Sequence, residues 1–209
     1  PRVLDRGTGT GLLAMMAVRA GASPGEVTAC EGFEPMARLA ARVLADNRMT
    51  DAVRVVPKHS TVMAAPPPDR KAELVVSEIL DTELIGEGVL GTLRHALTEL
   101  AADGAAVIPA GATVRGVLVE SELLRGWHRP GPPWSVGGAA EPPPGRMVDV
   151  QADALESAIT VLCDPFDALR FDFSTPPATH GGTELVVTPT AAGIADAVLL
   201  WWDAHLDAD

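Results

Sequence analysis

A short stretch near the middle of the chain places carboxylates where they could bind a cation. Leu74–Val76 is an apolar run typical of a buried strand, and Glu78 follows almost at once. Glu87 comes nine positions later, between two glycines. A helix would not hold residues so spaced as neighbours, whereas a loop that doubles back could bring both carboxylates to one point. Two carboxylates suit a guanidinium, a planar fork of N–H donors. The alternative is a solvated acidic turn.

A glycine-rich loop near the start of the chain could bind a second ligand. The strand-like residues 3–5 lead into three alternating glycines, Gly7 to Gly11, and a helix is expected over residues 12–20. Glycines let a ligand approach the backbone, and a helix amino terminus directs N–H groups toward it. The spacing G-x-G-x-G is not the dinucleotide pattern G-x-G-x-x-G. Asp5, just before the loop, would repel a pyrophosphate but not a sulfonium or ammonium group.

Two further polar positions follow strand-like runs. Glu31 comes after the run 27–30, where an acid can bind a ribose diol, although it could instead cap the next helix. Ser60 lies in the loop after the run 53–56 and is a candidate for contact with an adenine edge. His59 beside it is, on its own pattern, an ordinary surface histidine.

The elements between these positions alternate strand and helix. Helices are also expected over residues 35–47 and 88–101, and a fifth strand over residues 105–108. This alternation predicts a parallel, doubly wound sheet that binds ligands at the carboxyl ends of its strands. Every candidate residue falls at such an end, namely Asp5, Gly7, Gly9, Gly11, Glu31, Ser60 and Glu78.

The pattern changes after Pro109, and the second half of the chain reads as β-rich. Residues 113–120 alternate in polarity, and short strand-like runs suggest an antiparallel barrel or sandwich. The runs are 158–162, 169–173, 184–188 and 197–202. Pro130–Gly145 is expected to be a loop, and the pair Trp201–Trp202 to place one ring in a core. The predicted domains are a Rossmann-like domain over residues 1–111 and a β-barrel-like domain over residues 112–209.

Composition excludes several function classes. The formal net charge of −12 argues against a surface that binds nucleic acid directly and favours basic partners. Two cysteines give no disulfide framework, which suits a cytoplasmic or nuclear protein, and the five histidines lack metal-ligand spacing. No apolar run is long enough for a membrane span. Because the chain opens directly on a strand and stops near Trp202, we expect a fragment truncated at both ends.

In these motifs the chain resembles the protein arginine methyltransferases. The resemblance rests on the glycine loop from Asp5 to Gly11, on Glu31, and on the double-acid wording Asp-Thr-Glu-Leu-Ile-Gly-Glu-Gly of residues 81–88. Residues 58–61, 112–114, 118–121 and 201–203 extend it along the whole chain. It implies a Rossmann-like class I S-adenosylmethionine-dependent methyltransferase domain followed by a β-barrel domain.

The resemblance also implies a role for each matching residue. Glu78 and Glu87 would be the catalytic pair that clamps the substrate guanidinium, and Asp81 and Glu83 would contact the substrate. Asp81 would narrow the pocket, which in the matching branch of the family goes with stopping at monomethylarginine. The residues implied to bind S-adenosylmethionine are Asp5, Gly7, Thr8, Gly9, Gly11, Glu31, His59, Ser60 and Glu78.

The expected partners are arginine-rich proteins, histones among them, and a second methyltransferase module in the same chain or a homodimer. The family's helices before the first strand are absent and the chain contains no Tyr, so we expect little turnover from this stretch alone. One alternative is a catalytically silent scaffold module, although such modules tend to lose the glycines or the second acid. Another is a small-molecule methyltransferase, which would not need two acids in one loop.

Overall fold

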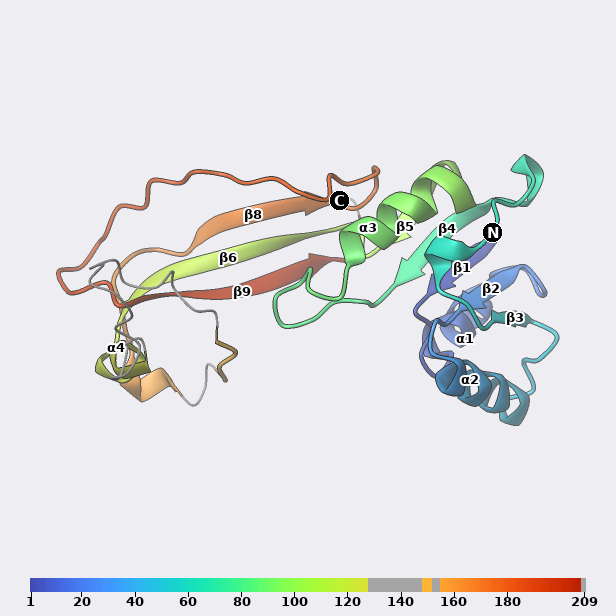
Figure 1. Cartoon of the computed structure of the whole chain (residues 1–209), viewed down its shortest axis with the longest axis horizontal. Helices are drawn as coiled ribbons and strands as arrows, with labels where there is room; N and C mark the ends of the chain where they lie inside the picture. The colour runs from blue at the N-terminus through green and yellow to red at the C-terminus, as the bar shows by residue number, and fades with distance from the viewer. Residues whose placement is uncertain (128–147, 152–154, 208–209) are drawn as a thin grey trace, which may run out of the picture. The chain divides into compact units, whose positions relative to one another are not determined.

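The computed structural model describes residues 1–127, 148–151 and 155–207, which form two compact units (Figure 1). The first unit comprises Pro1–Thr113, Leu169–Gly182 and Trp202–Asp209. The second comprises Val114–Ala168 and Thr183–Trp201. Both units therefore include residues from the second half of the chain.

A parallel sheet of five strands forms the centre of the first unit. The strands are β1 (Val3–Arg6), β2 (Val27–Cys30), β3 (Val53–Val56), β4 (Ala72–Ser77) and β5 (Ala101–Ile108). Their order is β3-β2-β1-β4-β5, and every neighbouring pair is parallel. The order reverses between β1 and β4, so the carboxyl ends of these two strands are where a ligand is expected. The predicted Rossmann-like fold is confirmed.

Helices cover both faces of this sheet. On one face α1 (Leu12–Arg19) and α2 (Glu34–Asp46) pack against alternate strand residues, because period-two alternation puts Val3, Ala29 and their equivalents on that side. On the other face lies α3 (Val89–His95) (Figure 1). The helix expected over residues 88–101 is shorter than predicted, since its last part is a π-helical turn, Ala96–Leu100.

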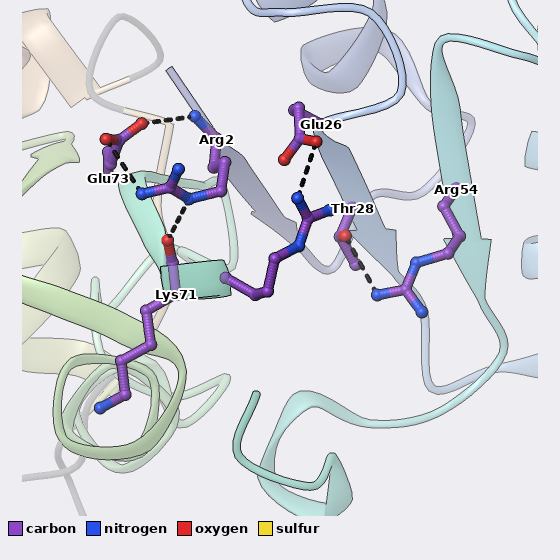
Figure 2. Close-up of polar contacts among 7 residues, drawn as sticks. Arg2, Glu26, Thr28, Arg54, Lys71 and Glu73 are labelled. Atoms are coloured by element: carbon purple, nitrogen blue, oxygen red, sulfur yellow. Dashed lines mark hydrogen bonds and ion pairs between the residues drawn. The ribbon is translucent and has the colours of Figure 1, made fainter. Parts of the chain in front are cut away.

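Arginine side chains hold together the amino-terminal end of the sheet (Figure 2). The backbone N–H of Arg2 donates to the Glu73 carboxylate at 2.9 Å, and its Nε donates to the carbonyl of Lys71 at 2.8 Å. Arg70 pairs with Glu26 at 3.1 Å, and Arg54 donates to the Thr28 hydroxyl at 3.2 Å. A cavity of about 550 Å³ lies at this end. Its one carboxylate, that of Glu26, is already paired, so this cavity offers no acid pair for a cation.

The second sheet has four strands centred on β6 (Gly111–Glu120). This strand pairs with β7 (Thr160–Val161), β8 (Phe166–Asp172) and β9 (Ala197–His205). The prediction of a strand over residues 184–188 is wrong, since that segment pairs with no other strand and Val186 is almost fully exposed. Closure into a barrel stays a prediction, and Pro130–Gly145 lies outside the described residues.

The second unit has a small core of its own beside α4 (Glu122–Trp127). Val117, Val119 and Leu124 pack there with Cys163. Among the described residues, no helix is both long and apolar enough to cross a bilayer, and no group of three His, Cys, Asp or Glu side chains could hold a metal.

Candidate functional site

A cavity of about 440 Å³ opens at the carboxyl ends of the parallel strands in the first unit. This volume lies in the range of small-molecule sites, roughly 300–1,000 Å³. Six residues predicted to form a site lie in its wall, although they come from four separate parts of the chain. They are Gly7, Glu31, His59, Ser60, Glu78 and Glu87. The wall is completed by Arg6, Cys30, Gly32, Phe33, Ile79 and Thr92.

The glycine loop closes the sheet side of the cavity. The backbone N–H groups of Gly7 and Thr8 both donate to the carbonyl of Cys30 at 3.0 Å, so the loop is tied to β2. Gly7 has φ +66°, and a Cβ there would lie 2.5 Å from the Cγ2 of Ile79. Only glycine fits this position without strain, because the left-handed region is unfavourable for other residues and the neighbouring side chain leaves no room.

Asp5 lies beneath the loop instead of in the cavity wall. The side chain is fully buried and accepts from the Thr8 hydroxyl and, at 3.0 Å, from the Ala14 backbone N–H of α1. Burial raises the pKa of Asp5 to about 6. The carboxylate therefore holds the loop on the helix. Gly9 and Gly11 also do not line the cavity, so the predicted contacts of these loop residues with a cofactor stay predictions.

The raised pKa of Asp5 predicts how stability changes with pH. The folded state binds the Asp5 proton more tightly than the unfolded state does, because the pKa rises from 3.8 to about 6 on folding. We expect the wild type to lose about 3 kcal/mol of stability relative to Asp5→Asn as pH rises from 3.8 through 6. Chemical denaturation of both proteins at pH 4, 5, 6 and 7 measures this difference. A difference that stays constant across this range would contradict the prediction.

Glu31 follows β2 and already accepts two backbone hydrogen bonds. Its Oε2 accepts from the N–H of Gly9 at 3.1 Å, and its Oε1 from the N–H of Phe33 at 2.9 Å. These contacts tie the carboxylate to the glycine loop and to the start of the following segment. His59 and the buried Ser60 line the same cavity from the loop after β3, and their predicted contact with an adenine stays a prediction.

The loop of residues 78–88, called the double-acid loop, brings Glu78 and Glu87 to the same cavity. Glu78 comes directly after β4, and Glu87 lies in the turn that precedes α3. Both side chains are exposed. Between them the side chain of Leu84 is fully buried, and this burial anchors the loop to the body of the unit. The backbone of Leu84 has φ +70°. The predicted doubling back is therefore present, and the two carboxylates share one cavity.

Asp81 closes this loop from within. Its Oδ1 accepts from the N–H of Gly86 at 3.0 Å, and its carbonyl accepts from the N–H of Leu84 at 2.9 Å. Neither Asp81 nor the exposed Glu83 lines the cavity. Their predicted contact with a substrate stays a prediction. The hydrogen bonds of Asp81 fix the path of the loop.

Trp202 supports the double-acid loop from far along the chain. The indole Nε1–H donates to the carbonyl of Asp81 at 3.0 Å, and both residues belong to the first unit. Of the tryptophan pair, Trp202 is partly buried and Trp201 is exposed, so the expectation of one ring in a core is met only in part. The sequence signalled the pair but not its partner, because 121 positions separate Trp202 from Asp81.

Removal of this indole N–H should loosen the loop. In Trp202→Phe the carbonyl of Asp81 keeps the Leu84 N–H but loses its indole donor, which costs roughly 1 kcal/mol and should make local opening of the loop about fivefold more frequent. Hydrogen exchange at the backbone N–H groups of Leu84 and Gly86 measures the change. Trp201→Phe is the matched control and should leave these rates unaltered. Equal rates in wild type and Trp202→Phe would show that the contact does not hold the loop.

Comparison with known proteins bears on this site. No protein-family model matches the chain. Over 99% of its length the chain is 43% identical to protein arginine N-methyltransferase 7 of Aedes aegypti, of which it covers 32%. It is 38% identical over 99% of its length to protein arginine N-methyltransferase 7 of Oryza sativa subsp. indica, of which it covers 31%. The chain thus spans about a third of the length of these curated relatives.

A solved structure supports the same relationship at the level of the fold. The chain is similar to the Trypanosoma brucei PRMT1 enzyme–prozyme heterotetrameric complex with AdoHcy, with a TM-score of 0.62 and 21% identity. The match covers 83% of this chain and 53% of the other. The chain is therefore homologous to a segment of protein arginine methyltransferases, and the resemblance inferred from its sequence is confirmed.

Proposed function

We propose that this chain, as a homologue of a segment of the protein arginine methyltransferases, forms the part of an enzyme that transfers a methyl group from S-adenosylmethionine to arginine in proteins. One observation carries the proposal. The paired acids Glu78 and Glu87 line the same cavity as Gly7 and Glu31, so the proposed guanidinium site and the proposed cofactor site share one space. A small-molecule methyltransferase would not need this acid pair.

The cavity fits the proposed cofactor. Gly7 leaves the floor of the cavity without a side chain, and Glu31 offers a carboxylate for a diol. His59 and Ser60 line the region proposed for the adenine. When bound, S-adenosylmethionine supplies an activated methyl group on a positively charged sulfur, and the acidic wall favours a cation.

Glu78 and Glu87 would bind and orient the substrate. A guanidinium offers donors along two edges, and two carboxylates that converge on one cavity can each accept a bidentate pair. This grip fixes which terminal nitrogen faces the methyl donor, and such positioning lowers the entropic part of the barrier. Carboxylates on the guanidinium also stabilise positive charge while that nitrogen gives up its conjugation.

The same carboxylates would accept the proton that methylation releases. Arginine stays protonated at neutral pH, so its nitrogen must lose one proton as the new N–C bond forms. Among the residues that line the cavity, Glu78 and Glu87 are the carboxylates proposed to hold that nitrogen. We propose that the proton leaves to one of them and then to solvent, because both side chains are exposed.

We further propose that the product is monomethylarginine. The carboxylate of Asp81 ties the loop to Gly86, which limits how far Glu87 can retreat from a bulkier, already methylated nitrogen. The net charge of −12 favours basic, arginine-rich substrate proteins, histones among them, in the cytoplasm or nucleus. A second methyltransferase module in the same chain, or a second copy, would complete the active assembly.

The test uses the complete natural chain with S-adenosylmethionine, carrying a deuterated methyl group, and an arginine-rich peptide. Mass spectrometry should find one labelled methyl on each modified arginine. Dimethylation would retain the proposed reaction but overturn the product limit. Intact cofactor binding without any methylation would contradict the proposed activity and favour a silent scaffold.

A further inference from the structure

The cavity of about 550 Å³ at the amino-terminal end of the parallel sheet shares no lining residue with the cavity that holds Glu78 and Glu87. Part of its wall is a row of Cα partners on adjacent strands, Leu4 of β1, Thr28 of β2 and Arg54 of β3. Paired residues of adjacent strands point to the same face of a sheet, here the face opposite α1 and α2. Residues 63–70, between β3 and β4, contribute a further part of the wall.

The charges around this cavity reverse the balance of the chain as a whole. The chain carries 28 acidic and 16 basic side chains, yet arginines outnumber acids among the lining residues, which include Arg2, Arg54, Arg70 and Glu26. Arg70 pairs with Glu26 at 3.1 Å, and Arg2 pairs with Glu73 at 3.0 Å. These two ion pairs leave the charge of the third arginine over.

Arg54 is this third arginine, and its partner is neutral. Its Nη2 donates to the hydroxyl of Thr28 at 3.2 Å (Figure 2). Among the described residues, no carboxylate forms an ion pair with Arg54. A hydroxyl orients a guanidinium without neutralising it, and the other N–H donors of the planar fork stay available to a ligand. The cavity wall therefore offers an oriented, uncompensated positive charge.

We propose that this cavity binds a small organic monoanion, namely a carboxylate attached to an apolar body. The carboxylate would accept a bidentate pair of hydrogen bonds from Arg54, the geometry that a guanidinium fork favours. The apolar body would pack against Met63, Pro66 and Leu100, and the volume lies in the range of small-molecule sites, roughly 300–1,000 Å³. One uncompensated charge favours a monoanion over a phosphate dianion. The site is independent of the methyl transfer proposed above.

The test is an NMR titration of the complete natural chain, isotope-labelled at its methionine methyl groups, with benzoate. Benzoate should shift the methyl signal of Met63, which lines the cavity, and leave that of Met36 on α2 unshifted. Benzamide has nearly the same shape without the charge and should bind at least about tenfold more weakly, because the charge-assisted hydrogen bonds are lost. Benzyl phosphate represents the other class of anion and should bind no more tightly than benzoate.

Two variants and a control locate the charge that matters. Arg54→Met should weaken benzoate binding about tenfold, because it removes the uncompensated guanidinium. Thr28→Val keeps this charge but removes the hydroxyl that orients it, and should weaken binding roughly threefold. Arg38→Met is the matched control and should bind benzoate as the wild type does, since Arg38 is exposed on α2, pairs with Glu34 and lines neither cavity. Thermal unfolding shows that each variant is folded.

Several outcomes would overturn the proposal. They are an unshifted Met63 signal, equal binding of benzoate and benzamide, and equal benzoate affinity in the folded Arg54→Met and Arg38→Met variants. Tighter binding of benzyl phosphate than of benzoate would show that the site takes a phosphate and not a carboxylate. Because the two cavities share no lining residue, Arg54→Met should leave the affinity for S-adenosylmethionine unchanged.

Discussion

The substitution Glu87→Gln is expected to lower arginine methylation by about a hundredfold or more while leaving the affinity for S-adenosylmethionine nearly unchanged. The amide keeps the shape of the side chain but removes one negative charge from the proposed guanidinium clamp and one acceptor for the released proton. Removal of a single preorganised electrostatic contact commonly costs on the order of 100- to 1,000-fold in rate. Steady-state kinetics with an arginine-rich peptide and calorimetry with the cofactor measure the two effects separately.

Glu83→Gln is the matched control for this change. Glu83 belongs to the same loop and is equally exposed, but it does not line the cavity. The Glu83→Gln variant should therefore methylate the peptide within about threefold of the wild-type rate, since exposed charges contribute little, and a larger loss would instead support the predicted contact of Glu83 with the substrate. Equal losses in the two variants would show that the loop acts through its total charge and not through the position of Glu87.

The second large effect is expected for Gly7→Ala, which should weaken binding of S-adenosylmethionine tenfold or more. A Cβ at this position would lie 2.5 Å from Ile79, and the backbone would be held at φ +66°. The left-handed conformation costs a residue with a side chain roughly 1–2 kcal/mol, and the clash displaces either Ile79 or the loop. Calorimetry of cofactor binding, with thermal unfolding of the same samples, measures both consequences.

The Gly21→Ala variant distinguishes the effect of backbone strain from the effect of the clash with Ile79. Gly21 also has a positive φ, but a Cβ there would meet nothing within 4 Å, and it lies in the turn after α1. This variant should lose stability and keep its cofactor affinity. A Gly7→Ala variant that binds the cofactor as the Gly21→Ala variant does would contradict a role for the glycine loop in the site.

Much of the fold could be predicted because local patterns determine it. Apolar runs that end in an acid located β2 and β4, and the acids Glu31 and Glu78 came to one cavity because parallel strands share a carboxyl edge. Helix boundaries agreed within a residue or two where the apolar stripe was regular. The strand prediction for residues 184–188 was wrong because an apolar segment forms a strand only when a partner strand is available.

Contacts between residues far apart in the chain could not be predicted from the sequence. Nothing near Asp81 indicates that Trp202 binds its carbonyl, because only folding brings them together. The buried position of Asp5, which places it under the loop, was also not evident from its spacing. The burial of Arg6 in the cavity wall was not evident either, because a strand turns neighbouring side chains to opposite faces and the sequence does not show how each face is covered.

A crystal structure of the complete natural chain with S-adenosylhomocysteine and an arginine-containing peptide would test the central claim most directly. We expect one substrate guanidinium to lie in the cavity, with carboxylate oxygens of both Glu78 and Glu87 about 2.7–2.9 Å from its nitrogens. A guanidinium bound outside this cavity, or held by neither carboxylate while the thioether occupies the glycine loop, would contradict it.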